Sequence, residues 1–268
     1  MGYSVTVNSF FTEKYLNTIY DHQSPGYWHV LTCYFRRFFL LFSVQKYDLR
    51  IIEKEIFPYL PAFAELFLSK VNQYWVDYDD AVFHNYDQKD NFMVNLLMPK
   101  KIDHVMKMAN RVIVGNDYLK KRAEVAGAKK IEVFPTVIDP KKYKVKEDQS
   151  PFKTITIGWI GSPSTLKYLD PIVPILDWIH EHYSIKFLLV NGKSKMKFKG
   201  RIESIPWTED GEVEAILKMD IGIMPLPDNP WERGKCAYKL IQYMACGLPV
   251  VASPIGMNKD VVIHGENG

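Results

Sequence analysis

Short apolar runs alternate along this chain with longer segments whose apolar residues recur at helical spacing. The short runs predict β-strands and the longer segments predict helices. We expect strands at residues 3–7, 49–52, 74–77, 111–114, 131–134, 154–160, 186–190, 221–224 and 248–252. We expect helices at residues 28–43, 62–69, 90–110, 209–218 and 235–246, with two more beginning at a cap on Asn116 and at Ser164 or Thr165. Strands that alternate with helices favour parallel sheets, which bind ligands at the carboxyl ends of their strands.

One polar stretch divides this pattern. Residues 139–153 (DPKKYKVKEDQSPFK) lack apolar periodicity, which is typical of a linker. A chain of 268 residues is long enough for two small domains. We therefore expect an α/β protein with two Rossmann-like parallel-sheet domains, at residues 1–140 and 151–268.

The segment 219–256 holds the strongest candidate for a binding site. Its sequence, MDIGIMPLPDNPWERGKCAYKLIQYMACGLPVVASPIG, predicts a buried strand, a loop, a helix ended by Gly247 and a second buried strand. A helix that begins between two parallel strands directs free amide groups and the positive end of its dipole at the ligand edge. Arg233 and Lys235 add full charges there, so we expect a phosphate or pyrophosphate.

Polar residues of this predicted helix share one face. Lys235, Lys239 and Gln242 stand at positions i, i+4 and i+7, so a helix beginning at residue 235 would present two lysines and an amide together. A solvated basic face is the alternative interpretation. The backbone amides that would meet a diphosphate belong to Gly234, Lys235, Cys236, Ala237 and Tyr238.

Composition narrows the classes of function. Lysine and arginine total 34 against 31 acidic residues, an excess too small to predict nucleic-acid binding. Cys33, Cys236 and Cys246 form no paired motif and are typical of core residues in a reducing compartment. His180 and His182 lack a nearby third ligand, so we expect no metal.

The sequence shows no signal peptide and no membrane-spanning run, which predicts a cytoplasmic protein. Residues 34–42 (YFRRFFLLF) nevertheless have two interpretations. One is a helix packed on the sheet, with its arginine heads reaching water. The other is a basic aromatic surface that contacts anionic lipid at the inner face of a membrane.

Residues 219–256 also resemble the donor-binding signature of the retaining glycosyltransferases of family 4, especially the bacterial branch that builds cell-surface polysaccharide. Further similarities lie at residues 157–163 (IGWIGSP), 205–207 (IPW), 78–81 (YDDA) and 111–116 (RVIVGN), so the resemblance extends over nearly the whole chain. It implies the GT-B fold, in which two Rossmann-like domains face a cleft. Compared with that family, the first strand with its glycine loop and the C-terminal helices are missing, so we expect a fold incomplete at both ends.

The resemblance also implies roles for single residues. It places Gly161 and Ser162 near the donor phosphates, where the alternative is an ordinary turn, and Trp207 at the base, where the alternative is core packing. Many relatives carry two glutamates eight positions apart, which contact the donor sugar and the ribose. Alignment through residues 245–249 puts these positions at Gly234, which has no side chain, and Gln242, which can still hydrogen-bond a ribose. Candidates to replace the first glutamate are Glu232 and Asp228.

Taken together, these features predict transfer of a sugar from a nucleoside diphosphate sugar to a saccharide or lipid-linked hydroxyl, with retention. The donor is a substrate, and we expect no cofactor. Arg233, Lys235 and Lys239 would stabilise the leaving diphosphate. Asp79, in a carboxylate cluster at a strand end, would bind the acceptor or stabilise charge near the anomeric carbon, unless the cluster only forms a turn. Two other functions stay open: a nucleotide-sugar epimerase of the same fold, and a non-catalytic nucleotide-binding or scaffold subunit, which the missing glutamates favour.

Overall fold

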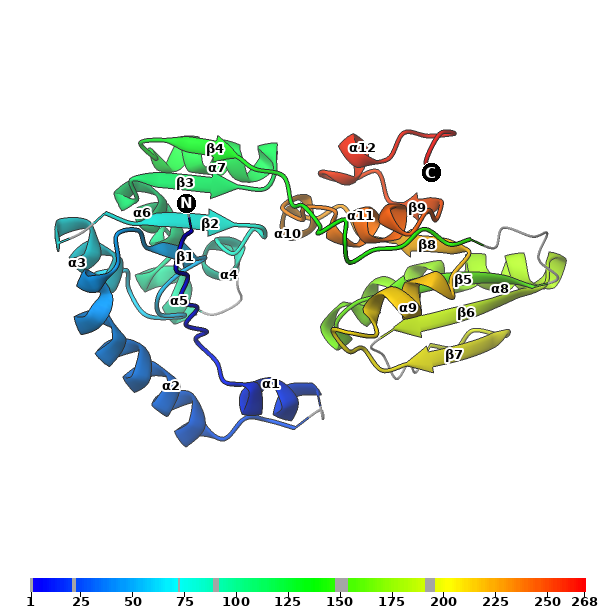
Figure 1. Cartoon of the computed structure of the whole chain (residues 1–268), viewed down its shortest axis with the longest axis horizontal. Coiled ribbons are helices and arrows are strands. Elements are labelled where there is room, and N and C mark those ends of the chain that lie inside the picture. The colour runs from blue at the N-terminus through cyan, green and yellow to red at the C-terminus, as the bar shows by residue number, and fades with distance from the viewer. Residues whose placement is uncertain (1, 21–22, 72, 89–91, 148–153, 191–195) are drawn as a thin grey trace. The chain divides into compact units, whose positions relative to one another are not determined.

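The computed structural model describes residues 2–20, 23–71, 73–88, 92–147, 154–190 and 196–268. The chain forms two compact units, each built around a parallel sheet (Figure 1). The first unit comprises Met1–Tyr78, Val82–Val114 and Leu119–Val133. The second comprises Asp79–Ala81, Gly115–Tyr118 and Phe134–Gly268. Two short segments that follow strands of the first sheet therefore belong to the second unit.

The first sheet has the strand order β1-β2-β3-β4, and all neighbouring strands are parallel. Its strands are β1 (Ile51–Glu53), β2 (Trp75–Tyr78), β3 (Arg111–Val114) and β4 (Ile131–Val133). Alternate residues of the two central strands are buried, as expected of a sheet with a packed face. The helices in this half of the chain are α1 (Glu13–Tyr20), α2 (Tyr27–Leu40), α3 (Phe63–Val71), α4 (His84–Asp87), α5 (Phe92–Leu97), α6 (Lys101–Met108) and α7 (Asp117–Ala126), with a 3₁₀ helix η1 (Leu41–Lys46) after α2.

The second sheet has the order β7-β6-β5-β8-β9, again parallel throughout. Its strands are β5 (Ile155–Ile160), β6 (Ile185–Val190), β7 (Arg201–Ile205), β8 (Ile221–Met224) and β9 (Val250–Ala252). Its α-helices are α8 (Val173–His182), α9 (Glu212–Leu217), α10 (Pro230–Arg233), α11 (Tyr238–Ala245) and α12 (Asn258–Val261), and two 3₁₀ helices, η2 (Pro163–Tyr168) and η3 (Asp170–Ile172), precede α8.

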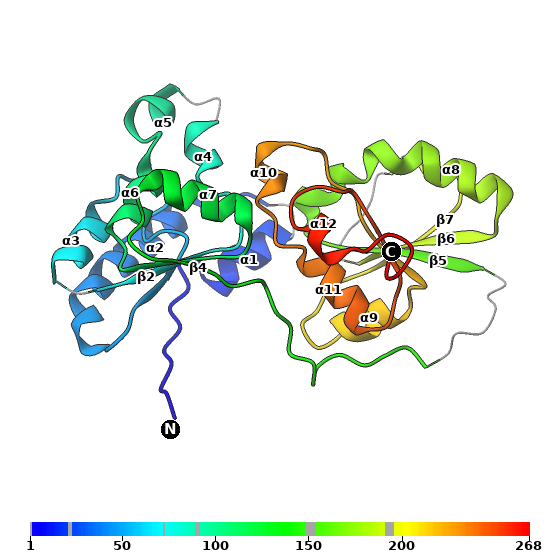
Figure 2. The same ribbon diagram turned by 90° about the horizontal axis from the view of Figure 1, so that it is seen from above.

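Helices cover both faces of the second sheet. Figure 2 shows α8 on one face and α9 with α11 on the other. The side chains of β6 divide accordingly: Phe187 and Leu189 pack with Leu176 of α8, whereas Leu188 joins the cluster that contains Leu240 of α11. Burial on both faces explains why the central strands of this sheet read as continuous apolar runs in the sequence.

Several predicted elements differ from the structure. Residues 3–7 form no strand, although their side chains alternate in character. The helix expected at 90–110 is two helices, α5 and α6, because Pro99 disfavours the helical conformation at Met98; residues 90 and 91 lie outside the described residues. Strand β7 was not predicted, since it is an edge strand with only a weak apolar alternation.

Prolines also explain the difference after β5. The helix predicted to begin at Ser164 or Thr165 is replaced by η2 and η3, and α8 begins only at Val173. Pro163, Pro171 and Pro174 lack the N–H groups that a continuous α-helix over this stretch would require.

The helix predicted at residues 28–43 is confirmed as α2, continued by η1. Among its aromatic side chains, Phe35, Phe39 and Phe42 are exposed, and an apolar hollow of about 470 Å³ lies beside the helix. Arg36 and Arg37 donate hydrogen bonds to backbone carbonyls of residues 8–10. Contact with a membrane surface stays a prediction. Within the described residues, no helix has the length and apolar character needed to cross a membrane.

Candidate functional site

The ammonium group of Lys239 marks the centre of the candidate site. Lys239 lies in the first turn of α11, and its Nζ stands 4.7 Å from the centre of the buried Trp159 ring of β5. Gly161 follows β5 directly, and a Cβ there would come within 2.7 Å of this Nζ and 2.5 Å of the indole. Glycine is therefore required for the backbone at the end of β5 to approach the lysine.

The surroundings weaken the hold of Lys239 on its proton. Burial, followed by the positive charge of Lys235, lowers the pKa of Lys239 to about 8, while the negative charge of Asp80 opposes this shift. A lysine with such a pKa lies in a site that favours an added negative charge. The arrangement is therefore suited to an anion that arrives at the carboxyl end of β5.

The loop before α11 is not helical, which corrects the predicted start at residue 235. Ala237 has left-handed backbone angles (φ 56°) and acts as the N-cap, so the helix begins at Tyr238. Lys235 consequently does not share a helical face with Lys239. The first amides of α11, which have no acceptor within the helix, still lie next to Lys239.

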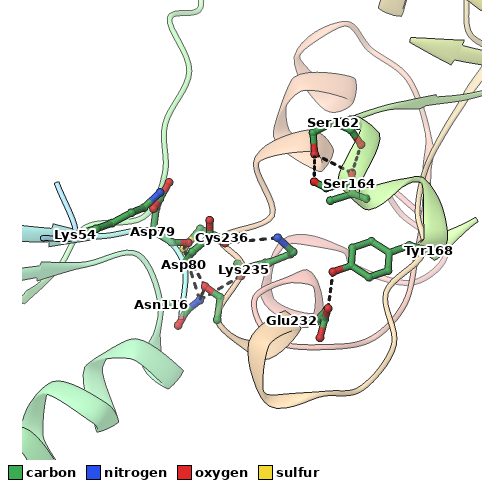
Figure 3. A network of polar contacts seen from close by, with 12 residues as sticks. Lys54, Asp79, Asp80, Asn116, Ser162, Ser164, Tyr168, Glu232, Lys235 and Cys236 are labelled. Carbon is green, nitrogen blue, oxygen red and sulfur yellow. Dashed lines mark hydrogen bonds and ion pairs between the residues drawn. The ribbon is translucent and has the colours of Figure 1, made fainter. Parts of the chain in front are cut away.

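Asn116 fixes the shape of this loop. Its side-chain amide donates to the backbone oxygens of Gly234 at 3.0 Å and Lys235 at 3.1 Å (Figure 3). The thiol of Cys236 donates to the backbone oxygen of Asp79 at 3.1 Å, and burial raises the pKa of this thiol to about 12, so it remains a donor. Asn116 thus does more than cap α7, the role expected from the sequence.

The position of the missing glutamate is closed by backbone. Gly234 packs against Ala81, such that a Cβ on the glycine would lie 2.5 Å from the Ala81 Cβ and 2.8 Å from its amide nitrogen. A side chain cannot fit there without a shift of the loop. The carboxylate of the preceding residue, Asp80, lies 3.5 Å from the ammonium group of Lys235. Asp80, rather than the exposed Asp79, therefore directs its carboxylate at the cations of the loop.

Two carboxylates considered as replacements already have partners. Glu232 is buried and accepts a hydrogen bond of 2.5 Å from the Tyr168 hydroxyl. Asp228 forms an ion pair of 2.7 Å with Arg233, which raises the pKa of Arg233 and lowers that of Asp228. Both members of this second pair are exposed, so Arg233 lies on the surface with a counter-ion rather than beside Lys239.

Gln242 is buried, in contrast to the open polar face expected from its spacing. Its amide donates to the Tyr143 hydroxyl at 2.9 Å, and Tyr143 in turn donates to Glu212 at 3.0 Å. The other oxygen of Glu212 accepts from the indole of Trp207 at 2.9 Å. Trp207 follows β7 and remains 37% exposed, so its ring is held at one edge without being part of the core.

Small hydroxyl residues line the turn after Gly161. The Ser162 hydroxyl lies 2.9 Å from that of Ser164 and 3.4 Å from that of Thr165. Ser162 is exposed, and its side chain makes no cap bond to the 3₁₀ helix that it precedes. These hydroxyls can donate to an anion in the same region as Lys239.

Several of these contacts could not be found from the sequence. Asn116, Tyr143 and Glu212 are far in sequence from the loop or turn that each supports, and none of them belongs to a motif. Among the residues that the structure describes, no three histidine, cysteine or acidic side chains are grouped to hold a metal ion.

Comparison with known proteins identifies the second half of the chain. Residues 154–268 match the sequence model of the family described as "Glycosyl transferases group 1". A curated relative from Bacillus subtilis (strain 168), provisionally named the teichuronic acid biosynthesis glycosyltransferase TuaH, is 27% identical over 167 residues. The match covers 56% of this chain and 41% of that protein, so the chain spans about two fifths of the length of this relative.

Solved structures of glycosyltransferases share the fold. A sucrose-phosphate synthase from Thermosynechococcus elongatus has a TM-score of 0.62 at 16% identity, over 87% of this chain and 63% of its own. Anabaena Alr3699/HepE, in complex with UDP, has a TM-score of 0.59 at 15% identity, over 87% and 66%. An Escherichia coli trehalose-6-phosphate protein bound with UDP-2-fluoro glucose has a TM-score of 0.57 at 14% identity, over 91% and 69%. Residues 154–268 therefore form a group 1 glycosyltransferase domain, within a chain that has the α/β fold with two parallel sheets of the GT-B glycosyltransferases.

Proposed function

We propose that this protein transfers a sugar from a nucleoside diphosphate sugar to a hydroxyl acceptor, with retention at the anomeric carbon. The observation that carries the proposal is the position of Lys239. Its ammonium group lies over Trp159 and against Gly161, in the first turn of α11 and at the carboxyl end of β5. A group 1 glycosyltransferase domain with a poorly solvated cation at this edge is suited to a leaving diphosphate.

The chemistry follows from charge. When the bond between the anomeric carbon and the diphosphate oxygen breaks, the electron pair stays with the diphosphate and its negative charge increases. Lys239 and the amides of the first turn of α11 stabilise this charge, and Lys235 adds a second cation that Asp80 holds in place. The acceptor oxygen forms the new bond to the sugar and gives up its proton. We include retention because of the resemblance to family 4, and the anomeric configuration of the product tests it.

We propose UDP as the first nucleotide to examine, because two of the structural neighbours were solved with UDP or a UDP-sugar analogue. For the acceptor we propose a saccharide or lipid-linked saccharide of a cell-envelope polysaccharide. The relative that is named for teichuronic acid biosynthesis supports this choice. No cofactor is part of the proposal.

Binding can be tested before the acceptor is known. We expect UDP or another nucleoside diphosphate to raise the melting temperature of the protein and to give a measurable heat in calorimetry. Lys239→Ala should weaken this binding roughly tenfold to a hundredfold, the range for losing one hydrogen bond to a charged group. Lys199→Ala is the matched control, because Lys199 is exposed and pairs with Glu181 just before the amino end of β7. Equal binding by both variants would refute the role of Lys239.

A second function is favoured by one observation. Gly234 is packed so closely on Ala81 that the acidic side chain found there in relatives cannot be accommodated. A non-catalytic nucleotide-binding subunit is consistent with this closed position. It predicts tight binding of a nucleoside diphosphate together with neither hydrolysis of any nucleoside diphosphate sugar nor transfer to a saccharide. Release of UDP from a UDP-sugar in the presence of an acceptor would eliminate this alternative.

A further inference from the structure

The turn after β7 presents an aromatic ring whose orientation is fixed from behind. Trp207 is 37% exposed, yet its indole N–H donates to Glu212 of α9 at 2.9 Å. An exposed tryptophan has two rotatable bonds, and this hydrogen bond holds one edge of the ring. The ring therefore loses little further freedom when a flat ligand packs on it.

Glu212 is itself held on a rigid element. It is buried, and it accepts the Tyr143 hydroxyl at 3.0 Å while lying 3.5 Å from the ammonium group of Lys142. Tyr143 also accepts the amide of Gln242 in α11. Because both carboxylate oxygens of Glu212 are occupied by protein groups, this residue acts through Trp207 rather than on a ligand. The chain of hydrogen bonds joins the helix of the candidate site to the turn after β7.

The sheet sets the separation between this ring and the cationic end of the site. Strands β7 and β5 are next-nearest neighbours in the order β7-β6-β5, and all their carboxyl ends lie at one edge. Two strand spacings amount to roughly 10 Å. A ribose placed between Gly161 and Trp207 would bring a base to the ring while the diphosphate meets Lys239.

We propose that Trp207 is the stacking platform for the nucleobase of the donor and that Glu212 is the residue that positions it. The inference rests on the proposed donor site. Stacking requires only the flat face of a base, so Trp207 contributes affinity without selecting among the bases. The ligand class is therefore a nucleoside diphosphate, and pyrophosphate alone leaves the platform unused.

Calorimetric titration of UDP and of pyrophosphate separates the two ends of the site. We expect wild-type protein to bind UDP more tightly than pyrophosphate. Glu212→Gln should weaken UDP binding roughly fivefold, the lower end of what base stacking contributes, because one of the two donors then faces an amide group. Pyrophosphate binding should not change.

A double-mutant cycle distinguishes positioning from a general structural effect. Trp207→Phe keeps a ring but removes the N–H, so Glu212→Gln should have no further effect on UDP binding in that background. Additive losses, or an equal loss of UDP and pyrophosphate binding in Glu212→Gln, would overturn the inference. If Glu212→Gln fails to fold, Trp207→Ala decides: loss of the preference for UDP over pyrophosphate supports the platform, and an unchanged preference overturns it.

The same titrations keep the two proposals apart. A wild-type protein that binds no nucleoside diphosphate overturns the proposed function and the platform together. Tight UDP binding that no change at Trp207 or Glu212 affects leaves the proposed function standing and overturns the platform alone.

Discussion

The lowered pKa of Lys239 leads to a specific dependence of nucleotide binding on pH. In the unliganded protein, burial and Lys235 bring this pKa to about 8. A diphosphate at the ammonium group favours the protonated form, so binding raises the pKa again and takes up a proton. We therefore expect the affinity for UDP to fall as the pH rises through about 8.

The size of the effect follows from the fraction of protein that carries the charge. With a pKa of about 8, Lys239 is about nine-tenths protonated at pH 7 and about one-tenth at pH 9. The apparent dissociation constant varies inversely with the competent fraction, so it should rise about tenfold between these pH values. Proton uptake on binding should increase from about 0.1 to about 0.9 over the same interval.

Calorimetry in buffers of different ionisation enthalpy measures both quantities. Terminal phosphate groups have a pKa near 6, so UDP itself changes little between pH 7 and pH 9. The thiol of Cys236, with its pKa raised to about 12, does not titrate in this interval either. Lys239→Arg, which stays charged, should show an affinity that is flat with pH, and Lys239→Met should be weak and flat.

A wild-type dissociation constant that is constant from pH 7 to pH 9, without proton uptake, would refute this reasoning. It would mean that the ammonium group does not meet the diphosphate, or that it is fully charged before the ligand arrives. A pH dependence that persists in Lys239→Met would assign the proton to another group.

Three further predictions concern stability and space. Lys239→Met should stabilise the unliganded protein at pH 7 by about 1–2 kcal/mol, a discount from the roughly 3 kcal/mol that the lowered pKa implies, because the side chain is still partly exposed. The sign follows from linkage: the unfolded state binds more protons between pH 8 and pH 10.5, so stability should rise with pH across that window and Lys239→Met should lose this rise in thermal melts. Gly161→Ala should displace the ammonium group and weaken pyrophosphate binding about tenfold in calorimetry, since the added Cβ falls 2.7 Å from it. Gly234→Ala should cost about 1–3 kcal/mol in denaturant unfolding because its Cβ would meet Ala81 at 2.5 Å.

Matched substitutions control for these three changes. Lys199→Met, at an exposed ion pair, should alter stability by less than about 1 kcal/mol. Gly26→Ala adds a methyl group where no atom lies within 4 Å and should change neither stability nor binding appreciably. A Gly161→Ala variant that binds pyrophosphate like the wild type, or a Gly234→Ala variant of full stability, would show that the backbone gives way more easily than the packing suggests.

Much of the fold follows from the sequence because buried parallel strands leave continuous apolar runs. Strand β3 is confirmed at the predicted residues, and β8 likewise. Gly247 ends α11 with a positive φ of 74°, as expected of a residue that stops a helix. The alternation at residues 3–7 was misleading because an alternating segment becomes a strand only where a neighbouring strand is available to pair with it.

The candidate site was predictable only in part. Lys239 and Gly161 were found because each follows a local rule, a helix start after a strand and a small residue at a strand end. The spacing rule failed for Lys235 and Gln242, since it assumed a helix that begins three residues too early. The left-handed angles of Ala237 depend on contacts that the loop makes with Asn116, more than a hundred residues away in the sequence. Such contacts leave no periodic signal.

The composition of the second unit has a practical consequence for protein engineering. Asp79–Ala81 and Gly115–Tyr118 belong to this unit, although they are encoded inside the first half of the chain. A truncated protein that starts at the linker would lack the amide of Asn116, and the carbonyl groups of Gly234 and Lys235 would lose their donor. Domain exchange at a single junction would therefore graft a nucleotide-binding lobe whose key loop is no longer anchored, and a chimaera needs all three segments from the same parent.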